Sequence, residues 1–247
     1  MDTYTVKPDD DLYPKRLRKL AKPPALLYCR GGPVGQLVAG STAAIVGSRK
    51  VSSYGRQVTY DIARGLADQG FTIVSGLATG VDTEAHEAAL VAGAPTIAVL
   101  PRAIDHIYPA SNMLLAKRIC DTGGAIISEY PTGTRAYRSN FVARNRIVSG
   151  LADVLIITEA GENSGTMHTV NFAAAQERLI FVVPGPLYSP HCQGSNNLLK
   201  RPGVMICTSA LDIIKALGKH QRKTRIHQVV SADPQEQILL DLLRAGV

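Results

Sequence analysis

The chain has 247 residues, of which 45% are hydrophobic and 19% charged, so it is long and apolar enough to bury the core of one large domain. Its 14 prolines and 22 glycines are ordinary numbers and exclude a collagen-like or wholly disordered chain. The formal net charge is +7, but five cations and no acid lie between residues 215 and 227, which leaves only +2 for the rest. Any nucleic-acid site outside that basic stretch must therefore be a local patch.

The apolar runs are too short to cross a bilayer, and the N-terminus lacks the basic and apolar regions of a secretion signal. We therefore expect a cytoplasmic protein with no membrane partner. The 4 cysteines are far apart, and no pair has the spacing of zinc ligands. Reduced thiols are the preferred interpretation, and we expect neither a metal site nor a cofactor.

Short runs rich in isoleucine, valine and leucine predict strands buried on both faces, which is the pattern of parallel sheets. These runs cover residues 43–46, 71–74, 96–100, 125–127, 154–157 and 180–183. Apolar residues with helical spacing lie between them, over 54–69, 83–91 and 112–120. This alternation predicts an α/β domain with right-handed crossovers and a doubly wound, mostly parallel sheet.

The two ends of the chain differ from this pattern. Residues 1–40 contain several prolines and predict a lead-in segment packed on the main domain, which we place at 41–217. Residues 218–232 are polar and basic and predict a short linker. Residues 233–247 contain one amphipathic helix, which is either the start of a truncated further domain or a docking helix.

In a doubly wound sheet, ligands bind outside the carboxyl ends of the strands, so the loops that follow the strands are the candidate sites. The first loop contains Gly47, Ser48 and Arg49, and Ser52 leads into the next helix. A glycine, hydroxyls, a guanidinium and a helix N-terminus together favour an anion site. The G-K-[ST] ending of a nucleotide-triphosphate loop is missing. A plain turn with Ser53 as N-cap is an equally good interpretation.

The second loop, residues 75–82, is made of small residues. Gly76 and Ala78 leave room for a ligand against the backbone. Asp82 is placed to cap the following helix. That helix contains His86, which we interpret as a packed residue rather than a catalyst.

The segment from Tyr130 to residue 152 combines cations with aromatic rings. It contains no acid, and Tyr137 and Phe141 are interleaved with four arginines, namely Arg135, Arg138, Arg144 and Arg146. Cations that follow a backbone, alternating with flat rings that accept bases, are typical of a surface that binds single-stranded nucleic acid. The alternative is that Phe141 packs in the core and the arginines pair with distant carboxylates.

The loop after the fifth predicted strand offers a further anion nest at a helix start, formed by Ser164, Gly165 and Thr166. Glu159, in the same loop, is the one carboxylate well placed to be a general base. No partner acid or nucleophile stands at a defined spacing from it, so the sequence gives catalysis little support.

Short motifs run in order along residues 13 to 217. They include Ala44 to Arg49, Ser75 to Ala78, Ser128 to Pro131, Phe141 with Arg144 to Ile147, Val183 to Gly185, and Gly194 to Asn196. Together these motifs resemble those of the DNA processing protein A family (DprA, also called Smf). The G-S-R loop and the F-x-x-R-N-R-I segment are specific in combination.

The resemblance implies an extended Rossmann-like domain that binds and protects incoming single-stranded DNA without being an enzyme. It also implies a homodimer that helps load the RecA recombinase during natural transformation, and often a winged-helix-like domain behind. Carried onto matching positions, the phosphate contacts are Ser48 and Arg49, and the floor is Gly76 and Ala78. The same implied pocket is lined by Arg144, Asn145 and Arg146, with Phe141 beside it.

The sequence departs from the family pattern at 101–103, at Val142 and at 167–170. We expect these departures to affect the local shape of the loops. An alternative class is the phosphoribohydrolase-like enzymes, with Glu159 and Arg144 in the catalytic roles. The P-G-G-x-G-T-x-x-E signature of that class is missing here. A scaffold whose sites have decayed is the third interpretation.

Overall fold

The structure is a computed structural model that describes residues 3–218. Contacts divide the chain into two units, Met1–Ala210 and Leu211–Val247. In the second unit, residues 211–218 are helical. The rest of the predicted linker and the helix predicted within 233–247 lie outside the described residues.

The first unit is built on one sheet with the strand order β1-β2-β6-β5-β4-β3-β7-β8-β9. The parallel strands are β3 (Thr42–Val46), β4 (Thr72–Ser75), β5 (Thr96–Val99), β6 (Ala125–Ser128), β7 (Val154–Ile157), β8 (Leu179–Val182) and β9 (Val204–Ile206). At one edge, β2 (Leu27–Gly31) and β1 (Thr3–Val6) continue the sheet in antiparallel pairing. The predicted α/β class and mostly parallel sheet are confirmed.

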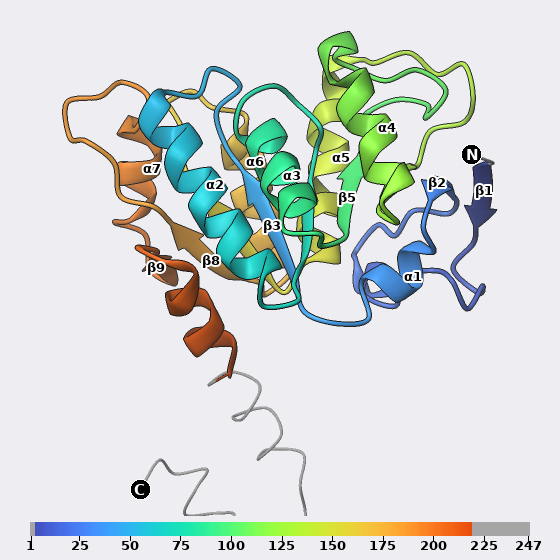
Figure 1. Cartoon of the computed structure of the whole chain (residues 1–247), viewed down its shortest axis with the longest axis horizontal. Helices are drawn as coiled ribbons and strands as arrows, with labels where there is room; N and C mark the ends of the chain where they lie inside the picture. The colour runs from blue at the N-terminus through green and yellow to red at the C-terminus, as the bar shows by residue number, and fades with distance from the viewer. Residues whose placement is uncertain (1–2, 219–247) are drawn as a thin grey trace, which may run out of the picture. The chain divides into compact units, whose positions relative to one another are not determined.

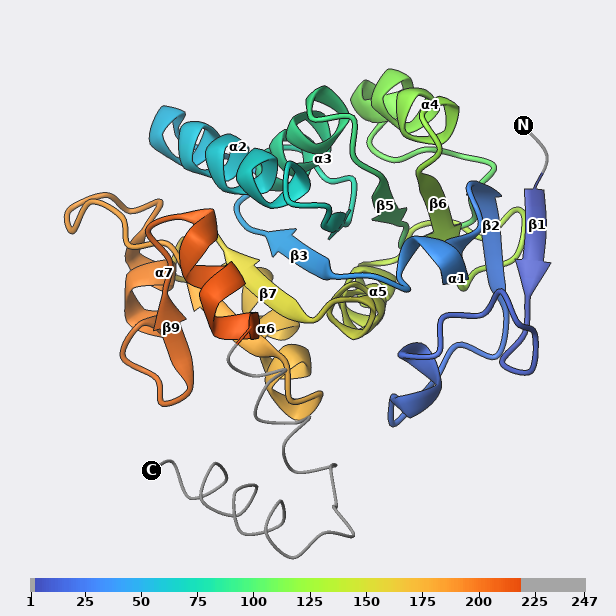
Figure 2. The same cartoon turned by 60° about the horizontal axis from the view of Figure 1, so that its bottom comes forward.

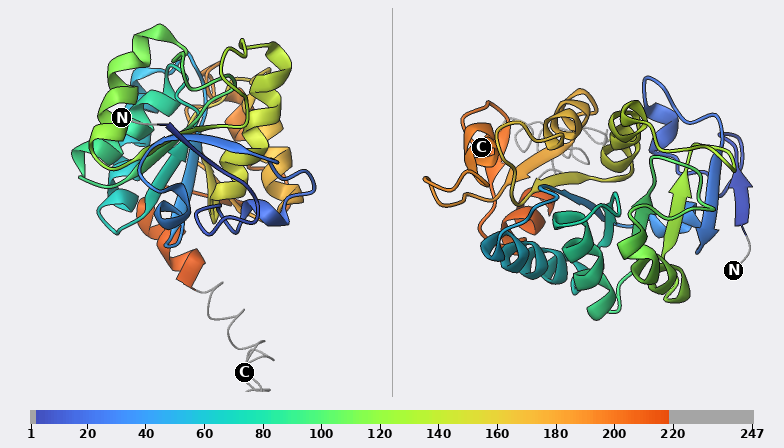
Figure 3. Two further views of the ribbon diagram at one scale, coloured as in Figure 1. Left: turned by 90° about the vertical axis from the view of Figure 1, so that its right-hand side faces the viewer. Right: turned by 90° about the horizontal axis from the view of Figure 1, so that it is seen from above.

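Helices cover both faces of this sheet. They are α1 (Val34–Leu37), α2 (Ser53–Ala67), α3 (Val81–Val91), α4 (Met113–Asp121), α5 (Arg138–Leu151), α6 (Thr166–Ala175) and α7 (Gln193–Leu198), with 3-10 turns at Leu17–Lys19 and Ala110–Asn112. Helices α2, α3 and α4 lie on one face, and α5 and α6 lie on the other (Figures 1 and 3). In the described part of the chain, no helix is long and apolar enough to cross a membrane.

Helix α2 shows how the sequence pattern produces a packed element. Of the apolar face predicted for it, Ile62, Ala63 and Leu66 are buried and Val58 is half-buried. The Ser52 hydroxyl accepts a hydrogen bond from the Gly55 N–H at 3.0 Å, which satisfies one of the free donors of the first turn. The alternative interpretation of this loop as a plain turn placed the N-cap at Ser53, and the structure has it at Ser52.

The order of the strands places a topological switch between β3 and β7. From β3 the chain builds β4, β5 and β6 outward on one side, and β7, β8 and β9 then follow on the other. The loops after β3 and β7 therefore start side by side, and the Ser48 N–H donates to the Glu159 carbonyl at 2.8 Å. This carboxyl edge is where such folds bind ligands.

The lead-in segment expected before residue 41 contains strands β1 and β2, which both belong to the sheet. The chain between these two strands packs on α5. Leu17 and Leu20 are buried and approach Gly150 of that helix. Arg16 reaches Asp153 at 2.8 Å, at the start of β7. These contacts fix the C-terminal end of α5, so the orientation of its N-terminal end at the opposite edge of the sheet is also restrained.

Candidate nucleic-acid interface

Three side chains from distant parts of the sequence form a stack at the carboxyl edge. The Arg49 guanidinium, from the loop after β3, lies 4.9 Å from the centroid of the Phe141 ring of α5. The Tyr108 ring, from the loop after β5, meets Phe141 at 5.8 Å between centroids with an interplanar angle of 76°. Both geometries are attractive, because an aromatic ring has a negative face and a positive edge. We call these three side chains the Arg49 platform.

Arg49 keeps its charge available at this platform. Its side chain is exposed, and in the described part of the chain it enters no ion pair. Phe141 is half-buried, so it is not a core residue, which was the alternative interpretation of its position. The platform therefore presents an exposed cation and accessible ring surface at one place.

Arg144 lies one helical turn after Phe141, but its side chain is only 5% exposed. Its Nη1 donates to the Gly76 carbonyl at 2.6 Å and also to the Val99 carbonyl. Only glycine fits at position 76, because a Cβ there would overlap the guanidinium group. Arg144 thus lies beneath the loops that follow β4 and β5, whereas the family resemblance implied that its side chain lines the DNA-binding pocket.

A buried carboxylate compensates the charge of Arg144. Asp82 accepts hydrogen bonds from the N–H groups of Gly76 at 3.1 Å and Ala78 at 3.3 Å. Burial raises the pKa of Asp82, and the nearby Arg144 opposes this rise. Burial lowers the pKa of Arg144 to about 10; Asp82 opposes this shift, and the charge of Arg49 adds to it. The guanidinium groups of Arg49 and Arg144 therefore lie within electrostatic reach of each other.

The loop after β4 has a tightly determined backbone. Leu77 has a φ of 58°, in the left-handed region that is rare for non-glycine residues, and its carbonyl accepts from Asn112 Nδ2 at 2.9 Å. Gly80 has a φ of 82°, and any side chain there would overlap the Ser48 carbonyl. The loop that contains Arg49 therefore packs directly on this loop.

Glu159 supports the Arg49 loop from the other side. It is 0% exposed, and its carboxylate accepts hydrogen bonds from the Ser52 N–H at 2.9 Å and from the Ser52 hydroxyl. A general base must reach a substrate, and the carboxylate of Glu159 is not exposed. The geometry therefore gives no support to the general-base role considered for Glu159. Ser52, predicted as a DNA contact, already uses its side chain as a cap and as a donor to Glu159.

The remaining predicted cations have different environments. Arg146 forms an ion pair with Glu129 at 2.6 Å, and both side chains are largely buried, so for Arg146 the alternative of a distant carboxylate is the one observed. Arg138 is exposed at the start of α5 and enters no ion pair among the described residues. Asn145 accepts from Arg144 Nε at 3.3 Å.

The predicted nest at the start of α6 lies on the loop after β7. The Ser164 hydroxyl donates to Thr166 Oγ1 at 2.8 Å and accepts from the Thr166 N–H at 3.2 Å, which closes a local turn. Gly165 is exposed beside it. These residues belong to the neighbouring switch-point loop, and no hydrogen bond in the described part of the chain joins them to Arg49.

The sequence did not predict that Tyr108 and Asn112 belong to this site. The Tyr108 ring packs against Phe141, which comes 33 positions later in the chain. No local pattern marks such a contact, because it arises only when β5 and α5 reach the same edge of the sheet.

The fold and this edge define a Rossmann-like α/β protein with a cation and aromatic rings at its switch point. The chain belongs to the DNA recombination-mediator protein A family, whose sequence profile matches residues 4–218. The resemblance found in the sequence is thereby confirmed.

Curated relatives are identical to the chain at about a third of the aligned positions. A putative DNA processing protein DprA of Mycobacterium tuberculosis is 36% identical over 249 residues, covering 96% of this chain and 62% of the relative. The DNA processing protein DprA of Bacillus subtilis is 36% identical, covering 83% of this chain and 68% of the relative. The chain thus spans less than two thirds of the length of the first of these relatives.

Solved structures agree with the fold. DNA processing protein A of Streptococcus pneumoniae superposes with a TM-score of 0.80 at 33% identity, covering 87% of this chain and 74% of that one. DNA processing protein A of Helicobacter pylori, studied for its single-stranded DNA binding mode, gives 0.78 at 34%, covering 89% and 97%. A molybdenum cofactor binding protein of Rippkaea orientalis, at 0.53 and 21% over 72% and 96%, shares the fold alone.

The two arginines of the site should affect stability differently. We expect Arg144→Ala to lower the free energy of unfolding by about 3–5 kcal/mol, because the Gly76 and Val99 carbonyls would lose their donor and the buried Asp82 would lose the charge that compensates it. Arg49→Ala should change it by less than about 0.5 kcal/mol, since its side chain is exposed. Urea unfolding of both variants measures these changes in the free energy of unfolding. If Arg144→Ala had as small an effect as Arg49→Ala, the buried position of Arg144 would be contradicted.

His86 should make stability depend on pH. Thr96 Oγ1 donates to the Ile73 carbonyl at 2.8 Å, so it accepts from His86 Nδ1 at 2.7 Å, and the ring is neutral. Burial, and then Arg144, lowers the pKa of His86 from 6.5 to about 3. The folded state thus binds fewer protons between these values, and the stabilisation from neutral His86 is complete above about pH 6.5 and lost as pH falls.

We expect the parent to lose up to ~1.4 kcal/mol per pH unit through His86 as the pH falls below about 6.5. His86→Asn keeps a donor near Thr96 and removes this titration, while the opposing titration of Asp82 is common to both proteins. The difference in free energy of unfolding between parent and variant should therefore shrink on acidification. A difference that stays constant with pH would contradict this assignment.

Proposed function

We propose that this protein binds single-stranded DNA at the carboxyl edge of its sheet, with the Arg49 platform at the centre. The stack of an exposed guanidinium on an aromatic ring at the switch point carries this proposal. Arg49 supplies a phosphate contact, and the rings of Phe141 and Tyr108 accept unstacked bases. The solved relatives are DNA processing proteins, one of them studied for its single-stranded DNA binding mode, which supports the same ligand.

The arrangement favours a single strand over a duplex. Bases in a duplex are stacked on one another and cannot reach Phe141, which is half-buried between its neighbours. A phosphate contact alone would serve both forms, so discrimination must come from the rings. The exposed Arg138, at the start of the helix that contains Phe141, adds a second cation on the same side.

The finer role belongs to the same proposal. We infer a non-enzymatic, homodimeric, cytoplasmic protein that protects incoming DNA and helps load the RecA recombinase during transformation. The family description as a recombination mediator supports this role. The buried, hydrogen-bonded carboxylate of Glu159 supports binding rather than catalysis.

Titration of a labelled oligothymidylate with the whole chain tests the site. Phe141→Ala should weaken binding by about 5- to 100-fold through lost stacking. Arg49→Ala should weaken it and reduce the slope of log K against log salt by about 0.7, the value for one phosphate contact on a single strand. Duplex DNA should bind more weakly than the single strand.

Arg64→Ala is the matched control, because this exposed arginine stands near the far end of α2 beside Asp68. It should bind like the parent. If Arg49→Ala and Phe141→Ala also bound like the parent, or if the duplex bound as tightly as the single strand, the site would be misplaced.

A further inference from the structure

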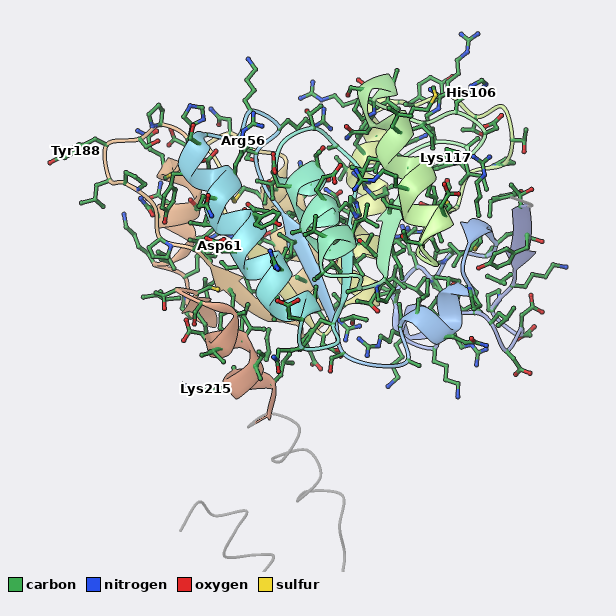
Figure 4. All side chains as sticks on the ribbon, in the orientation of Figure 1. Arg56, Asp61, His106, Lys117, Tyr188 and Lys215 are labelled. Carbon is green, nitrogen blue, oxygen red and sulfur yellow. The ribbon has the colours of Figure 1, made fainter. Side chains whose placement is uncertain are left out.

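The loop between β8 and α7 exposes two large side chains. Tyr188 is 97% exposed and Leu187 is 79% exposed. In the described part of the chain, the Tyr188 side chain makes no hydrogen bond, ion pair or ring contact. Figure 4 shows Tyr188 projecting from the outermost part of this loop, at the opposite end of the view from His106.

The base of this loop is held firmly. The Tyr54 hydroxyl of α2 donates to the Pro184 carbonyl at 2.6 Å. Gly185 and Asn196 form a reciprocal pair, in which the backbone N–H of Gly185 donates at 3.0 Å and its carbonyl accepts at 3.1 Å. The Cys192 N–H donates to the Ser189 carbonyl at 3.0 Å, which closes a turn. The exposed ring is therefore presented by an anchored loop, which lowers the entropy cost of a contact.

This loop borders the switch-point loops. The Pro190 carbonyl lies 3.4 Å from where a Cβ on Gly161 would stand, and His191 Nδ1 lies 4.0 Å from Glu159 Oε1. Since β8 neighbours β7 and β7 neighbours β3, the loops of all three strands follow one another along the carboxyl edge. Figure 2 shows β3 and β7 side by side. Neighbouring strands are about 4.8 Å apart, so one ligand can extend along this edge.

The region offers little charge that would oppose an anionic ligand. The loop between β8 and α7, residues 183–192, contains no acid, whereas the exposed Lys200 and Arg201 lie just before β9, at the opposite edge of the sheet. On the intervening loop, Glu162 is exposed and is the carboxylate that such a ligand must pass. A strand that continues beyond the Arg49 platform therefore meets little repulsion apart from Glu162.

We propose that Tyr188 is a distal base-stacking platform for the same single strand, which runs from Phe141 across the ends of β3, β7 and β8. This inference rests on the proposed function. A protein partner is the weaker fit, because a stable interface buries about 800 Å² per partner and two projecting side chains on one loop offer much less. A strand needs only one flat ring at each base it stacks.

The dependence on oligonucleotide length tests the track. We expect Tyr188→Ala to bind an oligothymidylate of about 16 nucleotides roughly 5- to 100-fold more weakly than the parent, and one of about 4 nucleotides equally well. Tyr188→Phe keeps the ring and should bind both like the parent. Leu187→Ala is the neighbouring control and should also bind both like the parent.

Glu162→Gln should change the affinity for the long oligonucleotide in the opposite direction to Tyr188→Ala. Removing the carboxylate that the strand passes should strengthen binding of the long oligonucleotide up to roughly 5-fold at low salt, and leave the short one unchanged. Weaker binding of the long oligonucleotide by this variant would place the strand elsewhere.

The outcomes separate this inference from the proposed function. If Arg49→Ala weakens both lengths while Tyr188→Ala weakens neither, the track is wrong and the platform stands. If neither variant matters, both proposals fail. If Tyr188→Ala weakens both lengths equally, Tyr188 is not distal. If Tyr188→Ala and Leu187→Ala lower the mass measured by light scattering but leave binding intact, the loop is a protein contact.

Discussion

The candidate site depends on the burial of one guanidinium, that of Arg144. Its hydrogen bonds to the carbonyls of Gly76 and Val99 attach α5 to the carboxyl ends of β4 and β5. Burying a charge is costly unless it is compensated, and the buried Asp82 lies within electrostatic reach of Arg144 while also holding the loop after β4. Because Phe141 stands one helical turn before Arg144, this attachment also places the ring next to Arg49.

Two arginines that look alike in the sequence therefore have separate tasks. Arg144 has lost nearly all contact with water and serves as an internal support, whereas Arg49 remains in solvent and keeps its charge for a ligand. Glu159 and Asp82 have parallel roles, since each accepts backbone hydrogen bonds from a loop at the edge of the sheet. The site is thus an exposed platform held by a buried polar framework, which fixes its geometry before a ligand arrives.

The sequence predicted the central strands and three helices, because apolar runs buried on both faces and helical stripes are local patterns. The family resemblance implied that Arg49 and Arg144 line one pocket; in the structure Arg144 stands on α5, within electrostatic reach of Arg49. The sequence could not separate the buried Arg144 from the exposed Arg138, because exposure depends on how α5 is rotated over the sheet. The pair between Arg146 and Glu129 depends on tertiary structure in the same way.

The modest charge outside the basic stretch limits how such a surface can bind a polynucleotide. Only a formal +2 remains outside residues 215–227, and Arg146 is already neutralised by its partner. Few phosphates can be contacted, so the electrostatic part of the affinity is small and the salt dependence shallow. Aromatic rings must then supply much of the affinity, and rings spaced along the sheet edge hold more bases without additional cations. This constraint gives a physical reason for a side chain as exposed as Tyr188 at the edge of the sheet.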